Sequence, residues 1–444
     1  MRNFGRALCT AALLGGLLSW PSSAQVSSDQ TILFRTFQLA LKDAQSRAYV
    51  GHAGFRVRDG AAFETMRAHI IRMYEGSVVV GSYQRDGEIF DCTTVASQPS
   101  VRLLGLHSIA SPPPFSPLAG ARPHVTDPSI VEVSQDTSNE RDAFGHVEWC
   151  QPGTIPMRRL TLDNIATYET LDQFFQKSSY QASSVPLQPA NNGHSYAILY
   201  RYVNNWGGSD YINLWRPAVN LPLGEQFSIS QEWYVGASNT PVEQTAEAGW
   251  VNGRYGTSNQ HTTTSSALFV FWTPNDYNPK GPGCWNLDCP GFVQYSSKVA
   301  LGSTFTNYST TQGTQYEVGL GYYLYQGNWW FSVGGDWIGY YPGSVYAGGQ
   351  LTKNAQLIEF GGETLASQNE WPFMGSGHFA STGFKSAAYH RLIYYRDVVG
   401  NFNNPPQMTV QQLAPACYTA TSQIWGGTTW ATYFFFGGPG GKKC

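Results

Sequence analysis

Short apolar runs separated by turn residues fill the chain from Gly193 onward, and this pattern restricts the fold more than any other feature of the sequence. The runs are rich in β-branched and aromatic residues, and Gly, Asn and Pro stand between them. We therefore expect residues 193–444 to form an all-β domain, an antiparallel two-sheet β-sandwich of the jelly-roll type. The runs cover residues 195–200, 227–235, 267–272, 316–325, 329–333 and 356–360.

Residues 25–165 have a different character, and we expect them to form a smaller α+β domain. Apolar residues recur at helical spacing within residues 32–48, and a strand-like run covers residues 77–83. Residues 166–192 are mostly polar. We predict that they form an exposed linker that contains a processing site.

The first 24 residues have the pattern of a signal peptide. Arg2 and Arg6 precede an apolar run over residues 7–18, and Ser-Ser-Ala at residues 22–24 provides small residues for cleavage. The apolar run is too short to span a membrane. We expect a soluble, exported protein, secreted to the extracellular space or the periplasm. The formal net charge of -3 gives no reason to expect nucleic acid or an anionic membrane as a partner.

The chain has 7 cysteines, of which Cys9 lies in the expected signal peptide. The remaining even number favours disulfides in an exported protein, although the sequence alone does not give their connectivity. A metal half-site at Cys284 and Cys289 is the alternative, but no second pair of Cys or His at ligand spacing completes it. Pairing of nearest neighbours is the simplest pattern, and it gives Cys92–Cys150, Cys284–Cys289 and Cys417–Cys444.

Two carboxylates stand in apolar, glycine-flanked segments: Glu247 in Ala-Glu-Ala-Gly-Trp and Glu363 in Phe-Gly-Gly-Glu-Thr. A carboxylate in such a place costs free energy unless it is paired, hydrogen-bonded or used in chemistry. Because side chains alternate along a strand, Gly249 shares a face with Glu247, and Gly361 shares one with Glu363. These glycines would let another backbone, such as a substrate strand, approach the acids. The two acids are candidates for a catalytic pair, and the alternative is buried acids hydrogen-bonded across the sheet.

Other catalytic arrangements are poorly represented. The chain has no Gly-x-Ser-x-Gly elbow, no His-Glu-x-x-His pair and no phosphate-binding Gly-rich loop with Lys. Ser376 and His378 invite a serine-hydrolase interpretation, but they are too close along one turn to act as nucleophile and base. Histidines of the sandwich region show no ligand spacing, and we expect structural hydrogen bonds from His194, His261, His378 and His390.

Several ordered motifs lie between residues 193 and 397. They are 227–233 (Phe-Ser-Ile-Ser-Gln-Glu-Trp), 247–250 (Glu-Ala-Gly-Trp), 269–273 (Phe-Val-Phe-Trp-Thr), 283–293 (Gly-Cys-Trp-Asn-Leu-Asp-Cys-Pro-Gly-Phe-Val), 338–342 (Ile-Gly-Tyr-Tyr-Pro), 361–363 (Gly-Gly-Glu) and 374–378 (Met-Gly-Ser-Gly-His). In this order they resemble the neprosin family of glutamic peptidases. Upstream, residues 91–92 (Asp-Cys) and 150–159 (Cys-Gln-Pro-Gly-Thr-Ile-Pro-Met-Arg-Arg) resemble the activation domain of that family. The resemblance therefore spans nearly the whole exported chain.

The resemblance implies a β-sandwich catalytic domain made as a zymogen, whose activation domain (residues 25–165) is removed on maturation. It implies cleavage of peptide bonds after proline in acid, with two catalytic glutamates that fall on Glu247 and Glu363. Gln231 is a weaker candidate for a contact to substrate or water. We also expect an apolar slot for the proline ring, with ordinary core packing as the alternative role of its candidates, Trp250, Tyr255 and Trp272.

Two carboxyl groups that share one water do not easily both ionise, so one can act as a base and the other as an acid. This predicts an acid pH optimum, without saying which glutamate plays which part. We expect the activation domain to act as an intramolecular inhibitor at neutral pH and to be released when acid protonates carboxylates at its interface. The expected substrates are proline-containing peptides or proteins, and we expect no metal and no other cofactor. The alternatives are a β-sandwich glycoside hydrolase with the same pair and a non-catalytic carbohydrate-binding protein.

Overall fold

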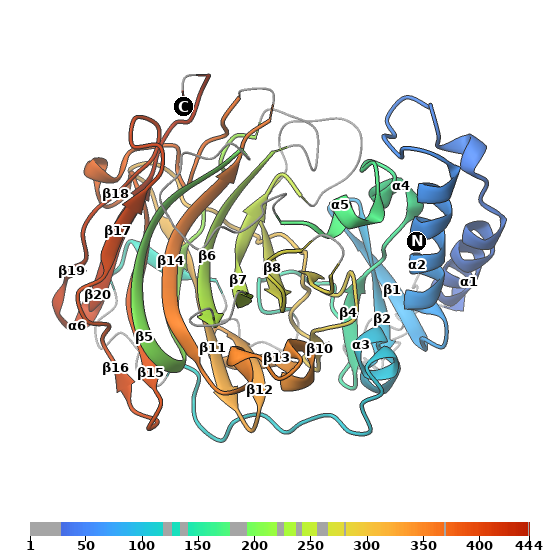
Figure 1. The fold of residues 1–444 in the computed structure, drawn as a ribbon, viewed down its shortest axis with the longest axis horizontal. Helices are drawn as coiled ribbons and strands as arrows, with labels where there is room; N and C mark the ends of the chain where they lie inside the picture. Colours follow the sequence, from blue (N-terminus) through green and yellow to red (C-terminus); the bar gives the residue numbers. More distant parts are fainter. Residues whose placement is uncertain are drawn as a thin grey trace, which may run out of the picture.

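The computed structural model describes residues 28–118, 127–133, 141–177, 193–219, 226–236, 242–254, 265–278, 281–367, 370–442 and 444. The expected signal peptide lies outside the described residues. The remaining chain forms a small N-terminal unit and a large β-sandwich, which lie side by side (Figure 1). No helix in these ranges is long and apolar enough to cross a membrane.

The N-terminal unit packs helices against a three-stranded antiparallel sheet of order β1-β2-β4. Its elements are α1 (Ser28–Asp43), η1 (Ser46–Ala48), α2 (Gly60–Tyr74), β1 (Val79–Arg85), β2 (Glu88–Thr94), η2 (Val95–Ser97), α3 (Pro99–Leu103), β4 (Thr154–Arg158), α4 (Leu162–Ile165) and α5 (Leu171–Phe175). Asp59 caps α2, because its side chain accepts a hydrogen bond from the amide of Ala62 at 2.8 Å. Phe63 and Ile70, about two turns apart on this helix, are buried in the core beneath it.

The sandwich consists of two antiparallel sheets that share one long strand, β5. Its elements are β5 (His194–Asn213), β6 (Phe227–Gly236), β7 (Gln244–Asn252), β8 (Ala267–Thr273), β9 (Cys284–Trp285), β10 (Val293–Gln294), β11 (Gln315–Tyr325), β12 (Asn328–Val333), β13 (Asp336–Pro342), η3 (Gly343–Tyr346), η4 (Gln350–Thr352), β14 (Ala355–Leu365), η5 (Ala380–Thr382), β15 (Ala388–Asp397), β16 (Phe402–Asn403), β17 (Thr409–Gln412), β18 (Thr419–Ala420), β19 (Ile424–Trp425), α6 (Gly427–Trp430) and β20 (Thr432–Gly437).

The first half of β5 pairs with β14 and β17, and its second half pairs with β11 and β15. In the part of the chain that the structure describes, the first sheet therefore runs β17-β5-β14-β6-β7-β8-β9. The second sheet runs β10-β13-β12-β11-β5-β15-β20. This confirms the expected antiparallel β-sandwich.

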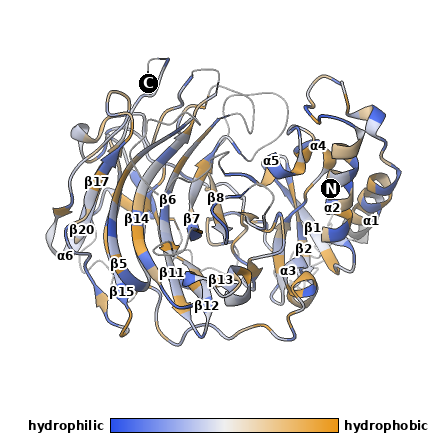
Figure 2. Cartoon of the chain, viewed as in Figure 1, coloured by the Kyte–Doolittle hydropathy of each residue, from blue (hydrophilic) through white to orange (hydrophobic). Residues whose placement is uncertain are grey.

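Side chains alternate between the two faces of each strand, and this alternation decides what fills the space between the sheets. Trp250 on β7 and Trp272 on β8 belong to the main core between the sheets. Phe271 belongs to a separate cluster on the outer face of the first sheet, where it stands opposite Glu247 in the strand register. Figure 2 shows the resulting mixture of apolar and polar residues along the curved strands. The candidate active site lies on the outer face of this sheet.

Two segments that we together call the strap, residues 104–118 and 127–133, follow the N-terminal helix α3 and lie along the sandwich (Figure 1). Phe115 packs against Trp337 and Phe402, with ring centroids 5.7 and 5.9 Å apart. Further along, β3 (Ile130–Glu132) pairs in parallel with the start of β11. Part of the region expected to form a small α+β domain therefore lies against the sandwich.

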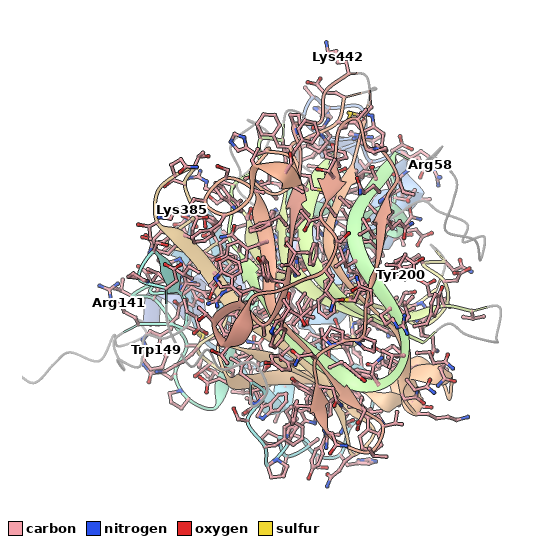
Figure 3. All side chains as sticks on the ribbon, turned by 90° about the vertical axis from the view of Figure 1, so that its left-hand side faces the viewer. Arg58, Arg141, Trp149, Tyr200, Lys385 and Lys442 are labelled. Carbon is pink, nitrogen blue, oxygen red and sulfur yellow. A yellow bond between two sulfur atoms is a disulfide. The ribbon has the colours of Figure 1, made fainter. Side chains whose placement is uncertain are left out.

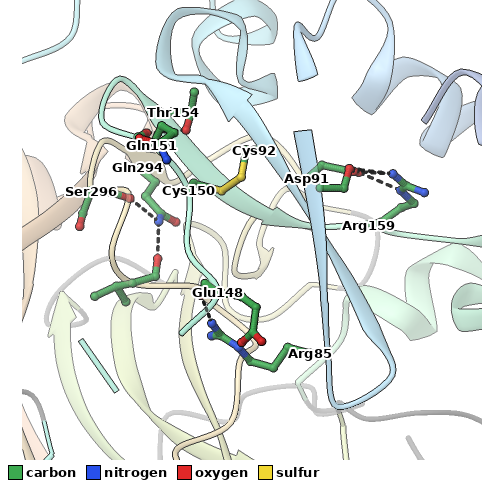
Figure 4. Close-up of a disulfide and its surroundings, with 12 residues drawn as sticks. Arg85, Asp91, Cys92, Glu148, Cys150, Gln151, Thr154, Arg159, Gln294 and Ser296 are labelled. Atoms are coloured by element: carbon green, nitrogen blue, oxygen red, sulfur yellow. Dashed lines mark hydrogen bonds and ion pairs between the residues drawn. A yellow bond between two sulfur atoms is a disulfide. The ribbon is translucent and has the colours of Figure 1, made fainter. Parts of the chain in front are cut away.

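Three disulfides join Cys92 to Cys150, Cys284 to Cys289 and Cys417 to Cys444, the same pairs that nearest-neighbour pairing gives. The first ties β2 to the segment that precedes β4 (Figure 4). Close to it, Arg159 and Asp91 form a buried ion pair, with Nε 2.9 Å from Oδ2. These links hold the N-terminal sheet together where it meets the sandwich.

Candidate active site

Strand register brings the two predicted acids to one face of the first sheet. Glu247 on β7 stands opposite Trp233 on β6, and Glu363 on β14 stands opposite Ile229 on the other side of β6. Gln231 lies between these two rows on β6. Residues two apart on β6 share a face, and residues directly opposite one another on neighbouring strands do too, so all these side chains lie on the outer face. The structure therefore brings Glu247, Glu363 and Gln231 together.

The glycines beside the acids have a different role from the one expected. A Cβ atom added to Gly249 would lie 1.9 Å from the carbonyl oxygen of Ser230, and one added to Gly361 would lie 2.6 Å from that of Ala197. Both oxygens belong to adjacent strands of the same sheet. The glycines therefore allow the strands around Gln231 to pack closely, and the close approach is not that of a substrate strand.

A single ammonium group joins the two acids. Lys177 Nζ forms an ion pair with Glu247, and it lies 3.0 Å from Glu363 Oε2 and 2.6 Å from Gln231 Oε1. Gln231 completes the ring, because its Nε2 donates to Glu363 Oε2 at 2.7 Å. The side chains of Lys177 and of both glutamates are at most 2% exposed. The two carboxylates thus lie within hydrogen-bond reach of one small group.

Lys177 enters the site from the linker, two residues after the end of α5. Arg254 donates to the carbonyl oxygen of Phe174 at 2.8 Å, and the Trp285 indole donates to that of Gln176 at 3.4 Å, so the sandwich holds this segment by its backbone. Exposed cations such as Arg141 and Lys442 lie at the periphery of the molecule (Figure 3). Lys177, in contrast, is buried against two acids.

Lys177 is a site residue that no sequence pattern predicts. It is a lone lysine in a polar linker, 70 residues before Glu247, and no spacing rule connects the two. A weak signal exists in hindsight, since the two phenylalanines of α5 precede it in an otherwise polar stretch. Such a pair indicates that the segment packs against something, but not where.

Glu363 receives further hydrogen bonds on its second oxygen. His194 Nδ1 lies 2.8 Å from Oε1, and the Tyr196 hydroxyl donates to the same atom at 3.1 Å. Burial would raise the pKa of this carboxyl, but the Lys177 ammonium and His194 outweigh burial and lower the pKa to about 2. Glu363 is therefore ionised, and because a carboxylate only accepts hydrogen bonds, His194 Nδ1 carries the proton that it donates.

Glu247 is surrounded differently. Its Oε1 accepts hydrogen bonds from the Thr245 hydroxyl and the Tyr277 hydroxyl, both at 2.6 Å. Burial, together with the charge of Glu247, raises the pKa of Tyr277 well above its ordinary value, so this hydroxyl remains a donor. Apart from Lys177, the hydrogen-bond partners of Glu247 among the described residues are the uncharged hydroxyls of Thr245 and Tyr277. The two acids of the pair are thus chemically unequal.

Two more acids lie on this side of the sheet. Burial and the neighbouring acids raise the pKa of Glu359 to about 8 and that of Glu243 to about 7. Both carboxyls are therefore neutral in acid solution and add no charge there. Within the described residues, no group of three or more His, Cys, Asp or Glu side chains is arranged to hold a metal ion.

The candidates for the proline slot lie elsewhere. Trp250 donates to the carbonyl oxygen of Asn213 at 3.0 Å, and Trp272 packs on Tyr341 with ring centroids 5.9 Å apart, so both are core residues between the sheets. Their side chains lie on the face of the sheet opposite to the acids. The prediction that Trp250 and Trp272 line a proline slot is therefore wrong. Tyr255 lies outside the described residues. Aromatic rings that do border the site, at 5.2 to 5.8 Å from Lys177 Nζ, belong to Trp233, Phe269 and Phe271.

A second polar cluster has the composition of a serine-hydrolase triad. Ser230 Oγ lies 2.9 Å from His390 Nε2, and His390 Nδ1 is bonded to Asp210. All three residues are fully buried between the sheets, where no substrate can reach the serine. This agrees with a structural role for His390. Ser376 Oγ accepts a hydrogen bond from the backbone amide of His378 at 3.1 Å, which is a turn contact.

The fold and the site together define a class of protein: a β-sandwich that carries a buried pair of carboxylates on the outer face of one sheet, with donors suited to acid–base chemistry. Residues 224–439 match the model of the Neprosin family, and this part of the chain belongs to that family. The match confirms the resemblance drawn from the motifs and supports a peptidase.

Two solved structures are also similar to the chain. One is a crystal structure of scytalido-glutamic peptidase with a peptide based transition state analog, at 8% identity and a TM-score of 0.26, covering 56% of this chain and 98% of that chain. The other is a crystal structure of the same peptidase with a transition state analog inhibitor, at 10% identity and a TM-score of 0.24, covering 55% and 98%.

Proposed function

We propose that the protein is an exported, acid-acting glutamic endopeptidase that is made as a zymogen and hydrolyses peptide bonds after proline. The observation that supports this most is that both Glu247 and Glu363 bind one ammonium group, that of Lys177. Hydrolysis by two carboxylates requires a water molecule held by both of them. An ammonium group is similar in size to water, so its position is suitable for that molecule.

In the proposed reaction Glu363 begins as the base and Glu247 as the acid. Glu363 takes a proton from the water while the water oxygen attacks the scissile carbonyl carbon, and Glu247 gives its proton to the carbonyl oxygen. When the carbon–nitrogen bond breaks, Glu363 passes its proton to the leaving nitrogen, and one hydroxyl of the intermediate returns a proton to Glu247. The pair then holds one proton again. The lowered pKa of Glu363 and the uncharged partners of Glu247 favour this division of roles.

The zymogen is part of the same proposal. Lys177 occupies the place that the water needs, and the linker that carries it is bound to Arg254 and Trp285 of the sandwich. A cation at this position also lowers the pKa of Glu363, and it takes the place of the proton that the reaction needs on the pair. The N-terminal region would thus inhibit the enzyme both by filling the site and by replacing the catalytic proton.

Preference for proline is supported by the aromatic rings of Trp233, Phe269 and Phe271. They stand around the Lys177 ammonium and would border the substrate once the lysine leaves. Flat apolar rings suit the pyrrolidine ring, which has no backbone donor of its own. Three disulfides in the described chain are consistent with export.

The test is hydrolysis in acid by the chain and by its Glu247→Gln and Glu363→Gln variants. We expect both variants to lose activity by at least about a hundredfold, because each removes one proton-transfer group, while circular dichroism shows an unchanged fold. Glu359→Gln is a matched control on β14, since its carboxyl is already neutral in acid, and it should retain activity. A retained activity of either dyad variant would overturn the assignment.

The substrate class needs a separate measurement. A peptide library digested at acid pH and read by mass spectrometry should yield products that end in proline. A panel of polysaccharides assayed in parallel addresses the alternatives. Sugar hydrolysis abolished by the same two variants would indicate a glycoside hydrolase, and binding without hydrolysis would indicate a carbohydrate-binding protein.

A further inference from the structure

We propose that His194 is a positioning residue of the mature enzyme, which holds Glu363 in place and keeps it in its carboxylate form after Lys177 has left. This inference rests on the proposed function of the glutamate pair. It adds a residue that the motifs do not single out and that the sequence analysis assigned only a structural hydrogen bond.

The position of His194 is fixed by the fold. It is the first residue of β5, opposite Leu365 in the register with β14, and it is 1% exposed. Its ring packs edge-on against Phe227 at 5.6 Å and lies parallel to Tyr196 at 6.3 Å. These contacts leave Nδ1 aimed at Glu363 Oε1, 2.8 Å away. Removal of the linker would not disturb any of these contacts, because all of them belong to the sandwich.

The charges around the pair show why this contact matters. On Glu363, the Tyr196 hydroxyl and the Gln231 amide are neutral donors, and on Glu247 the same holds for Thr245 and Tyr277. Burial raises the pKa of Tyr196 and of Tyr277 well above the ordinary value, so neither hydroxyl ionises. Among the described residues, the charged groups that face the pair are the cation of Lys177 from the linker and the imidazole of His194 from β5. The others are neutral donors (Tyr196, Gln231, Thr245 and Tyr277) and two acids that are uncharged in acid solution (Glu243 and Glu359).

Once Lys177 has left, His194 is the member of this set that can carry a positive charge. Its hydrogen bond and its charge are, after Lys177, among the causes that lower the pKa of Glu363. It contacts Glu363 and not Glu247, so it favours the ionised form of one acid and leaves the shared proton to the other. The geometry thus distinguishes the base of the pair from the acid, which the sequence motifs do not do.

The sign of the expected effect follows from the ionised state of Glu363. Activity falls when the pH drops far enough to protonate the base, so this carboxyl sets the acid limb of the pH profile. Burial would raise its pKa, and the cations lower it to about 2 while Lys177 is present. Without His194, the pKa of Glu363 in the mature enzyme rises, and the acid limb moves to higher pH.

Three variants separate positioning from packing. His194→Phe keeps an aromatic ring but loses the donor and the charge. His194→Asn keeps a neutral donor close to the position of Nδ1 but cannot become a cation. His378→Gln is the control, because His378 is exposed on a turn and contacts Thr311 instead of the pair. Thermal unfolding at neutral pH checks that each variant folds.

The experiment measures kcat/KM against pH for each matured variant on one proline-containing peptide. We expect the acid limb to move up by about one to two pH units in His194→Phe, by less in His194→Asn, and not at all in His378→Gln. A profile of His194→Asn or His194→Phe that differs from the parent only in height would overturn the proposal, as would an unmoved profile. The proposed function fails separately, if Glu247→Gln and Glu363→Gln remain active.

Discussion

Replacing Lys177 by methionine tests how strongly the linker is held in the site. Methionine fills similar space between the aromatic rings but carries no charge. In the parent, the pKa of Glu363 is lowered from 4.5 to about 2. At about 1.4 kcal/mol per pKa unit, the groups around this carboxylate stabilise its ionised form by roughly 3 kcal/mol. His194 supplies part of this, so we assign about 2 kcal/mol to Lys177, or roughly thirtyfold in the equilibrium between bound and released linker.

The pH dependence has a definite sign. Because the bound linker lowers the pKa of Glu363, the ionised Glu363 stabilises the bound state. This stabilisation of the bound linker is complete above pH 4.5 and is lost as the pH falls towards 2. Without Lys177 the two buried acids face each other with no cation from the linker, so one of them takes up a proton at higher pH. The linker is then released under milder conditions, and the precursor should begin to shorten at higher pH.

The assay follows the length of the purified precursor on a gel, and its hydrolysis of a proline-containing peptide, between pH 2 and pH 7. At a pH where the parent is slow, Lys177→Met should shorten roughly thirtyfold faster, and the double variant Lys177→Met, Glu247→Gln should not shorten. Lys42→Met removes an exposed lysine of the same N-terminal region and is the control. A Lys177→Met precursor as latent as the parent, with the same pH dependence, would refute the reasoning.

Two further predictions concern the sheet and the interface. Gly249→Ala should lower the free energy of unfolding by several kcal/mol, because its Cβ would lie 1.9 Å from the carbonyl oxygen of Ser230. A Cβ at Gly60 meets nothing closer than 3.7 Å, so Gly60→Ala should be tolerated. Thermal unfolding compares the two variants, and equal midpoint temperatures would contradict the packing argument. His69 binds the carbonyl oxygen of Asp288 across the interface at 2.8 Å, and burial lowers its pKa, so the released form takes up a proton first as the pH falls and docking weakens. His69→Gln keeps a donor without that proton uptake, and the precursor should shorten only at lower pH than the parent; an unchanged pH of shortening would exclude His69 as a trigger.

Much of the architecture could be predicted from local patterns. Runs of β-branched and aromatic residues separated by turn formers identify strands, because those residues fill a half-buried pleated surface. Side chains alternate between the two faces of a strand with a period of two residues. This alternation predicts which face of its strand carries Glu247 and which face of the glycine-rich strand carries Glu363. What the pattern does not contain is which strand lies between them, and here β6 supplies Gln231 as the bridge.

The errors have physical causes as well. Glu247 and Trp250 are three residues apart on one strand, so alternation alone places them on opposite faces, and the ring could not have bordered the acid. Lys177 is different, because no local rule identifies a residue whose environment is made by a segment that docks from afar. Long-range docking of this kind depends on the complete shape of the sandwich, and a one-dimensional pattern does not carry that information.

The strap has a consequence for what happens after the chain is cut in the linker. A cut between Lys177 and Gly193 would yield two polypeptides, yet the described parts of the strap would still contact the sandwich, through Phe115 and through the parallel pairing of β3 with β11. Aromatic and backbone contacts of this sort bind no protons, so acid does not dissolve them. If the zymogen proposed above is cut there, the nicked molecule would be a two-chain complex, and its lifetime would depend on how slowly these apolar and backbone contacts dissociate.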